Sequence, residues 1–451
     1  MRFIRGMLLF ILSALIMAAG CAHDKTIEKN PINKWFEVGT QAYVAERWNE
    51  AIDAYNKAIG LNPEIAEIYL NRGCAYGRLG NDNQAIADFD KAIKLNPKCA
   101  EAFKNRGSAN SRLGNNSQAI PDLDKAIELN PKFSDAYNNR GSAYINLGNY
   151  NQAIVDINKA IELDPQNAEA YNNRGSAYIA LGNYNQAIAD CGKAIELNPK
   201  HAGAFSNRGN AYLKIGNYNQ AIVDHNSAIE LNPKLAKAYY NRGTIYSSLG
   251  NYNQAIVDYD KAIELNLRYA DVYNNRGLAY SSLGNNNQAI ADYDKAIELN
   301  PKDAVAYYNR GNAYGSLGNK DQAIADYDKA IEFNPKFAEA YYNRGSVYGR
   351  LGQESQAIAD FDKAIELDPK NADAYNNRGF TYSNFGDYNQ AIADYNKAVE
   401  LDPKNDRAYV NRGNAYLKLG KNEQAISDIK KAASLGSKGA QDYLAKQGLN
   451  W

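Results

Sequence analysis

Apolar and small residues recur along this chain every three or four positions, in pairs of short runs separated by polar turns. In residues 134–163 the first run holds Tyr137, Gly141 and Tyr144, and the second holds Ala153, Ile157 and Ala160. Because residues at this spacing share one face of a helix, each run predicts an amphipathic α-helix. The two helices are expected to pack against each other through these faces.

The same pattern returns every 34 residues without insertion or deletion, which gives twelve repeats over residues 32–439. Positions are numbered here from 1 at Ile32. Gly at position 8, Ala at positions 20 and 27 and an aromatic at position 4 occur in all twelve repeats, and Pro at position 32 occurs in ten. Gly148-Asn149 shows the turn at positions 15 and 16. Helices are therefore predicted at positions 1–14 and 18–31, with position 32 closing the second helix.

This period and this set of Gly, Ala and Pro positions resemble the tetratricopeptide repeat (TPR) family. The resemblance implies an all-α fold, an α-solenoid in which twelve helix–turn–helix repeats form a right-handed superhelix with a concave groove. A single hairpin cannot bury both of its faces, so neighbouring repeats must stack. Residues 440–451 resemble the start of another first helix and are expected to form a C-terminal capping helix.

Position 6 of the first helix holds a polar residue that the helical pattern does not explain. On a helical wheel, positions 2, 5, 6, 9 and 13 form the sector away from the partner helix, which in the family lines the groove. Asn occupies position 6 in every repeat except the first, which has Glu37. The eleven residues are Asn71, Asn105, Asn139, Asn173, Asn207, Asn241, Asn275, Asn309, Asn343, Asn377 and Asn411.

Asn is a poor helix former, so helix propensity does not account for this row. A carboxamide offers both donors and an acceptor, so it can pair with the N–H and C=O of a bound peptide. The row is similar to the asparagine ladder in the repeat array of the protein O-GlcNAc glycosyltransferase, and it predicts a peptide-binding groove. Duplication of one ancestral repeat would also copy the Asn, although position 5 diverged while position 6 did not.

Groove positions that differ between repeats are the expected source of specificity. Tyr240, Tyr308 and Tyr342 at position 5 and Phe380 at position 9 make the C-terminal half more aromatic, and aromatics favour protein contacts. The N-terminal half carries acids at position 2 and bases at position 13, namely Glu67, Glu101, Asp135, Glu169, Arg78 and Arg112. Drift between copies explains the same differences equally well.

Position 7 is Arg and position 23 is Asp in the same eleven repeats, and the first repeat lacks both. This joint presence predicts an ion pair between the two helices of each repeat, with a scaffold role. Two repeats depart from the pattern: the third has Pro121 inside its second helix, and the seventh has Leu267 where the closing Pro is expected. Either place is a candidate hinge.

Residues 1–20 differ from the repeats and resemble a bacterial lipoprotein signal. Arg2 and Arg5 precede an apolar run at 7–19, and Cys21 follows. The resemblance implies lipid attachment at Cys21, a polar tether at 21–31, and a place on the periplasmic side of the bacterial envelope at the outer membrane. Ala18 stands where that family prefers Leu, so ordinary cleavage and an uncleaved anchor stay open, and all three readings export the chain.

No catalytic, metal or cofactor motif accompanies the repeats. The three His have no partner ligand at zinc spacing, no Cys-x-x-Cys occurs, and "GNAYGSLG" at 311–318 lacks the Lys-Ser/Thr of a phosphate loop. Lys+Arg and Asp+Glu both number 51, which gives no indication of a nucleic-acid partner. We therefore expect neither an enzyme nor a cofactor.

The sequence favours an exported scaffold, monomeric and lipid-anchored, that binds extended segments of other proteins in its groove. A self-assembling rod is the first alternative, although the atypical first repeat and the polar C-terminal helix resemble caps. A regulatory subunit of an envelope enzyme and a binder of carbohydrate or peptidoglycan are the other two.

Overall fold

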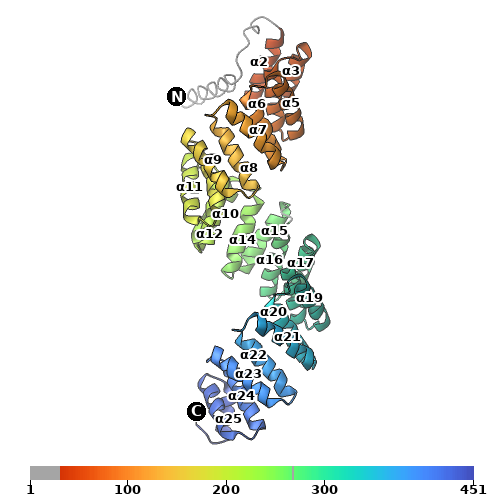
Figure 1. Ribbon diagram of the computed structural model, residues 1–451, viewed down its shortest axis with the longest axis vertical. Coiled ribbons are helices and arrows are strands. Elements are labelled where there is room, and N and C mark those ends of the chain that lie inside the picture. Colours follow the sequence, from red (N-terminus) through yellow and green to blue (C-terminus); the bar gives the residue numbers. More distant parts are fainter. Residues whose placement is uncertain (1–30, 267–268, 451) are drawn as a thin grey trace. The chain divides into compact units, whose positions relative to one another are not determined.

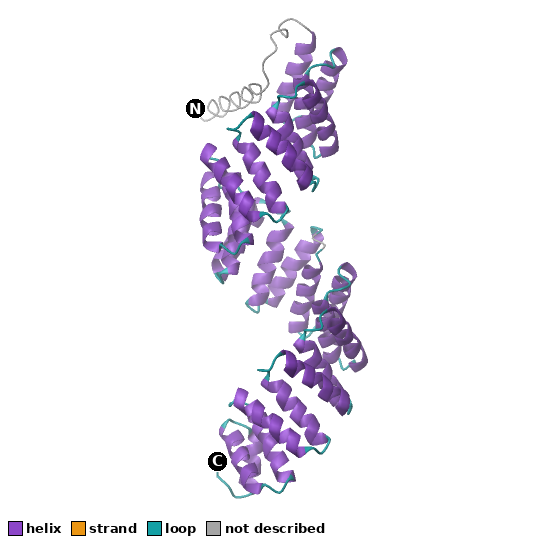
Figure 2. Ribbon diagram, in the orientation of Figure 1, coloured by secondary structure: helices purple, strands orange, loops and turns teal. Residues whose placement is uncertain are grey.

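The computed structural model describes residues 31–266 and 269–450 (Figure 1). Over these ranges the chain forms helices α2 to α26 and contains no strand, as Figure 2 shows. The all-α prediction is confirmed. No helix within the described ranges has the length and apolarity that a membrane crossing needs. The chain divides into two compact bodies between Ala238 and Tyr239, called here the N-terminal body and the C-terminal body.

Each repeat contributes one pair of helices. The first helices are α2 (Pro31–Val44), α4 (Ala66–Arg78), α6 (Ala100–Arg112), α8 (Ser134–Asn146), α10 (Ala168–Ala180), α12 (Ala202–Lys214), α14 (Ala236–Ser248), α16 (Ala270–Ser282), α18 (Ala304–Ser316), α20 (Ala338–Arg350), α22 (Ala372–Asn384) and α24 (Asp406–Lys418). The second helices are α3 (Trp48–Leu61), α5 (Asp82–Leu95), α7 (Asn116–Leu129), α9 (Tyr150–Leu163), α11 (Tyr184–Leu197), α13 (Tyr218–Leu231), α15 (Tyr252–Glu264), α17 (Asn286–Leu299), α19 (Lys320–Phe333), α21 (Glu354–Leu367), α23 (Tyr388–Leu401) and α25 (Asn422–Ser434).

These bounds lie within one or two residues of the predicted ones. Gly at position 15 adopts a left-handed conformation in every repeat from the second to the twelfth, as at Gly148 with φ 78°, and this ends the first helix. Most second helices end at position 30, because the following residue is extended, as at Asp164 before Pro165. The first repeat makes its turn with Glu46, a non-glycine residue at φ 58°.

Glycine at position 8 marks the closest approach of the two helices in a repeat. A Cβ on Gly141 would lie 2.5 Å from Ile157 Cγ1 and 3.2 Å from the carbonyl oxygen of Ala153. Position 24, which fills this contact, differs between repeats, and Ile157, Cys191 and His225 are all fully buried there. The small residue at position 8 therefore accommodates side chains of very different size at position 24.

The predicted ion pair between positions 7 and 23 is present in all eleven repeats. In each one Arg Nε donates to Asp Oδ2 over 2.7 to 2.8 Å, as from Arg140 to Asp156. Burial leaves the Asp156 side chain only 3% exposed. The hydrogen bonds that Arg140 donates to Asp156 raise the pKa of Arg140, so the guanidinium stays charged. The scaffold role is supported.

The same arginines also join consecutive repeats, which the sequence analysis did not anticipate. Arg140 Nη1 donates to Asp124, which stands at position 25 of the preceding repeat, over 2.6 Å. Eight other arginines make the same bond to Asp or Asn at position 25. Arg208 meets Gly192 at that position, and glycine has no side chain to accept the bond.

The irregular repeats keep their helices. Pro121 is exposed and lies inside α7, which continues on both sides of it. Helix α15 ends at Glu264 and is followed by Asn266 with φ 69°, while Leu267 lies outside the described residues. At the C-terminus, α26 (Lys438–Lys446) packs Ala440 and Leu444 against α25 and so covers its apolar face.

Candidate functional site

The asparagines of position 6 lie on the first helices, and most of their side chains are hydrogen-bonded to the preceding repeat. Nine of the eleven donate an Nδ2 hydrogen to a side chain at position 5 or 9 of that repeat. The acceptors are Cys74 Sγ, Ser108 Oγ and Asn312 Oδ1 at position 9, and Asn138, Asn172, Asn274, Asn376, Tyr240, Tyr308 and Tyr342 at position 5. Their distances are 2.8 to 3.2 Å.

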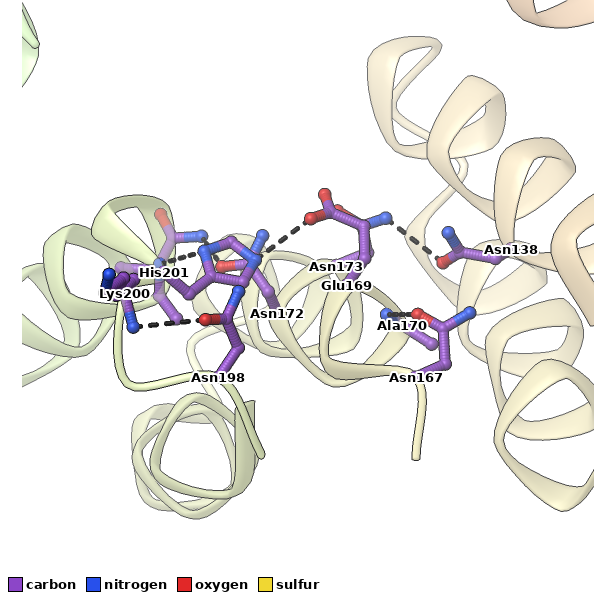
Figure 3. A network of polar contacts seen from close by, with 11 residues as sticks. Asn138, Asn167, Glu169, Ala170, Asn172, Asn173, Asn198, Lys200 and His201 are labelled. Atoms are coloured by element: carbon purple, nitrogen blue, oxygen red, sulfur yellow. Dashed lines mark hydrogen bonds and ion pairs between the residues drawn. The ribbon is translucent and has the colours of Figure 1, made fainter. Parts of the chain in front are cut away.

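Figure 3 shows one such contact, in which Asn173 Nδ2 donates to Asn138 Oδ1 over 3.1 Å. Each bond crosses from one repeat to the next, so the row has a structural function that sequence reasoning did not identify. In most of these residues the bond uses one of the two amide hydrogens, and in Asn343, which donates to both Tyr308 and Asn312, both are used, while a carboxamide also has an acceptor oxygen. The bond therefore fixes the orientation of each amide while leaving it chemically able to pair with a peptide.

Position 5 lies at the boundary between repeats rather than on an open surface. Asn138, Asn172 and Asn376 are only 5 to 7% exposed. Tyr240, Tyr308 and Tyr342 are half-buried, and each hydroxyl accepts a hydrogen bond from the Asn of the next repeat. Asn and Tyr at this position thus have the same role, since each side chain provides an oxygen that accepts a hydrogen bond from the Asn amide of the next repeat. Phe380 at position 9 is 51% exposed.

Four of the predicted binding residues line one cleft in the C-terminal body. Tyr342, Asn343, Asn377 and Phe380 share a hollow of about 780 Å³ between α18, α20 and α22. The lining also includes four charged side chains, Arg350, Glu354, Asp373 and Arg407. We call this the aromatic cleft. Two cations and two carboxylates balance, so its character is set by Phe380, Tyr342 and the Asn amides.

Glycine at position 12 is what opens this cleft. Gly315 and Gly349 belong to its lining, and a Cβ on Gly349 would have no neighbour closer than 3.9 Å. Other repeats fill the same position with Ile145, Ile179 or Leu213. Gly315 and Gly349 each lie in the last turn of a first helix, and a glycine inside a helix lowers helix stability, so its presence before the turn at position 15 was a usable sequence signal.

A second cleft lies in the N-terminal body and also has glycine at position 12. Its volume is about 520 Å³, and its lining includes Asn71, Asn105, Gly77 and Cys74. Three basic side chains, Arg78, Lys104 and Arg112, lie in the same lining. We call this the basic cleft. The two clefts contain two predicted asparagines each.

A polar network joins α10 to the start of α12, the helix that carries Asn207 (Figure 3). His201 Nδ1 accepts the backbone N–H of Ala204, so its proton is on Nε2, which donates to Glu169 over 2.9 Å. This hydrogen bond lowers the pKa of the Glu169 carboxyl. Glu169 therefore stays ionised and ties α10 to the start of α12, which carries Asn207.

Two of the three described cysteines have thiols of raised pKa. Burial raises the pKa of Cys74 to about 11 and that of Cys191 to about 12, so both thiols are protonated at neutral pH. Cys21, predicted to carry the lipid, lies outside the described residues. Across 31–266 and 269–450, no group of three His, Cys, Asp or Glu side chains is arranged to hold a metal ion.

Comparison with solved structures returns helical repeat proteins. The crystal structure of the APC/C hetero-tetramer Cut9-Hcn1 is 14% identical, covers 86% of this chain and 96% of that chain, and has a TM-score of 0.48. The crystal structure of yeast Tom70 is 20% identical, with coverage of 92% and 94% and a TM-score of 0.39. YrrB, described as a TPR protein with an unusual peptide-binding site, is 28% identical over 41% of this chain and 95% of that chain, with a TM-score of 0.37.

A comparison with curated proteins gave no match. Family models match without a break from residue 42 to residue 435. The model described as tetratricopeptide repeat matches residues 66–99, 100–133, 134–167, 168–201, 236–269, 270–303 and 338–371. Further repeat models match the intervals between and after these segments. The chain belongs to the tetratricopeptide repeat family.

Proposed function

We propose that this protein is a non-catalytic scaffold that binds an extended segment of another protein in the aromatic cleft. Tetratricopeptide repeats support a role in protein–protein interaction, and the fold is typically that of a scaffold. The observation that carries the choice of site is the meeting of Asn343, Asn377, Tyr342 and Phe380 in one hollow.

The chemistry of the aromatic cleft suits an extended backbone. Tyr308 and Tyr342 hold the amides of Asn343 and Asn377 in fixed orientation over 3.1 and 3.0 Å. Pre-oriented donors and acceptors bind a peptide with less loss of side-chain entropy than mobile ones. Phe380 then offers an apolar contact for a side chain of the segment, which is the kind of anchor that dominates protein interfaces.

Export and tethering are the second part of the proposal. The basic start, the apolar run at 7–19 and Cys21 resemble a lipoprotein signal, and they would place the scaffold on the periplasmic side of a bacterial envelope. Metabolic labelling with a fatty-acid analogue tests this part. Label should enter the native chain and be lost from Cys21→Ser, and equal labelling of both would contradict it.

Filling the aromatic cleft tests the binding function directly. We would compare the native chain with Gly315→Leu/Gly349→Leu, which places two side chains in the hollow without replacing any Asn. Leu213 and Leu417 occupy the same position in other repeats, so the substitution suits the fold. Gly60→Leu on α3 is the matched control, because a Cβ there meets nothing within 4 Å and Gly60 lines neither cleft.

Proteins captured from a solubilised envelope extract by the native chain and by Gly60→Leu would be identified, and the bound segment mapped to a synthetic peptide. Fluorescence anisotropy with that peptide should show at least about tenfold weaker binding by the filled variant, the loss that corresponds to about 1.4 kcal/mol. Unchanged affinity would overturn the proposal. The variant should unfold no earlier than the native chain, since Leu is the better helix former.

A further inference from the structure

The basic cleft differs in charge from the rest of this neutral chain. Arg78, Lys104 and Arg112 line it together with one carboxylate, Glu101. Asp82 adds a second carboxylate from just behind Arg112, so the cations still outnumber the acids. The aromatic cleft has two of each among its lining residues. The basic cleft is therefore a local excess of positive charge in a chain with 51 residues of each sign.

Arg112 is held in place against α4. Its Nε and Nη2 both donate to Asp82, with Nε at 2.9 Å, and the Asp82 side chain is 9% exposed while that of Arg112 is 49% exposed. A Cβ on Gly77 would lie 3.2 Å from Arg112 Nη2, so glycine at position 12 makes room for the guanidinium. The remaining N–H groups of an arginine held this way can donate to a second carboxylate without further ordering.

The three cations all lie close enough to Cys74 to influence the pKa of its thiol. Lys104, Arg78 and Arg112 each favour the thiolate form of Cys74, although burial outweighs them and keeps its pKa raised. Cys74 lines the same cleft, and its sulfur accepts the amide of Asn105 over 3.2 Å. The positive potential is thus present at the floor of the cleft, next to the asparagines.

Glu101 supplies an unused acceptor at the same place. Its Oε2 is buried and receives no hydrogen bond from any residue that the structure describes. A buried carboxylate oxygen without a donor is unfavourable, and a ligand N–H would satisfy it. The basic cleft therefore offers donors for an anion and an acceptor for an N–H, which are the two needs of a peptide that carries acidic side chains.

We propose that the basic cleft binds an acidic extended protein segment, whose side-chain carboxylates pair with Arg78, Lys104 and Arg112. The site is separate from the aromatic cleft and its residues lie in the other compact body, so the inference does not depend on the proposed function. It gives the scaffold two binding sites of different chemistry on one chain.

A protein segment fits these observations better than a nucleic acid does. Binding to a phosphate backbone needs a basic surface that follows many phosphates, and the excess here is confined to three side chains. The cleft also contains Glu101 and Asn105, which suit peptide groups. A nucleic acid remains a distinct outcome of the test.

The test uses the full-length chain in non-ionic detergent and a fluorescein-labelled, end-capped peptide of alternating Glu and Gly. A peptide of alternating Gln and Gly is the uncharged comparison, and labelled single-stranded oligo-dT is the third probe. Arg78→Asn/Lys104→Asn removes two cations from the cleft. Asn suits both places, because the fourth repeat has Asn146 at the position of Arg78 and Asn138 at the position of Lys104. Lys94→Asn/Lys132→Asn removes the same charge from residues outside the lining.

We expect the native chain to prefer the Glu peptide and to lose affinity as salt increases. Arg78→Asn/Lys104→Asn should bind the Glu peptide about tenfold more weakly, because each of the two lost ion pairs contributes a few-fold to the affinity. Lys94→Asn/Lys132→Asn should keep the native affinity. Equal binding of the Glu peptide by the cleft variant would overturn the inference, as would a preference for oligo-dT. The leucine-filled aromatic cleft should leave this affinity unchanged, so failure of one site is distinguishable from failure of the other.

Discussion

Two glycines one turn apart on α20 should respond in opposite ways to the same substitution. A Cβ on Gly345 would lie 3.0 Å from Asp360 Cβ and 3.2 Å from the Ala357 carbonyl oxygen, while a Cβ on Gly349 would have no neighbour within 3.9 Å. These two atoms near Gly345 belong to the backbone of α21 or attach directly to it, and the ring carbon Cε1 of Phe361 also lies 3.2 Å away. The first two atoms cannot move aside unless the two helices separate.

The expected change in stability of each variant is its gain in helix propensity minus any cost of overpacking. Gly345 lies in the interior of α20, where Gly→Ala gains roughly 0.8–1.0 kcal/mol of helix propensity, and Gly349 is the penultimate residue, where the gain is at most about that size. Only Gly345→Ala must also overpack the contact, which costs about 1–3 kcal/mol. We therefore expect Gly349→Ala to stabilise its repeat by up to about 1 kcal/mol. Gly345→Ala should be less stable than Gly349→Ala by up to about 3 kcal/mol, because only Gly345→Ala overpacks the contact with α21.

Hydrogen exchange of the α20 and α21 amides is the suitable assay, because repeat arrays open locally and a single global unfolding free energy is not well defined. Protection should increase in Gly349→Ala and decrease relative to it in Gly345→Ala. Asp360 also pairs with Arg344, so the exchange of both helices should change together. Equal protection of the two variants would refute the close approach on which the helix packing was argued.

Three further outcomes are expected. Glu46→Gly should stabilise the first repeat by about 1–2 kcal/mol by removing a left-handed non-glycine residue, whereas Glu46→Ala should not, and hydrogen exchange of α2 and α3 measures both. Gly192→Asp should give Arg208 the partner it lacks at position 25 and stabilise by roughly 0.2–1 kcal/mol over Gly192→Ser; a difference that persists undiminished in high salt would contradict this. The pKa of Glu169 is lower in the folded state than in the unfolded state. The ionised Glu169 carboxylate therefore stabilises the fold fully above the unfolded-state pKa of about 4.3, and this stabilisation is lost as the pH falls through the folded-state pKa. Glu169→Gln should therefore reduce the urea midpoint at neutral pH and lose that difference in acid; a constant difference would be contrary to the assignment.

Sequence periodicity was sufficient for the helices and their packing because each repeat obeys the same local rules. Gly148 and Pro165 set helix ends directly through their allowed backbone angles. The Arg–Asp pair was also predictable, since both partners are absent together from the first repeat. The contact from Arg140 to Asp124 was missed because position 25 holds Asp in some repeats and Asn in others. Both side chains offer an oxygen acceptor, but this shared property is harder to see in a sequence than a conserved residue type.

The partners of the Asn row were hidden for the same reason. Position 5 changes from Asn138 to Tyr240 to Asn274, which reads as free variation in the sequence. In the structure these side chains meet one requirement, an oxygen within reach of the next Asn amide. That requirement becomes visible only when repeats are stacked. The clefts also depend on stacking, because a glycine at position 12 opens a hollow only where the side chains around it leave the space unfilled.

This double use of the Asn row decides which experiment can establish binding. Replacing Asn343 by Ala would remove a candidate rung, but it would also remove its hydrogen bonds to Tyr308 and Asn312 and so disturb the boundary between repeats. Lost affinity could then arise from either cause. Leucine at Gly315 and Gly349 fills the hollow from position 12 without replacing any Asn, so a loss of affinity with unchanged stability indicates that the segment occupies the cleft. The position that four other repeats fill with Ile or Leu is therefore a more informative place to test binding than the asparagines themselves.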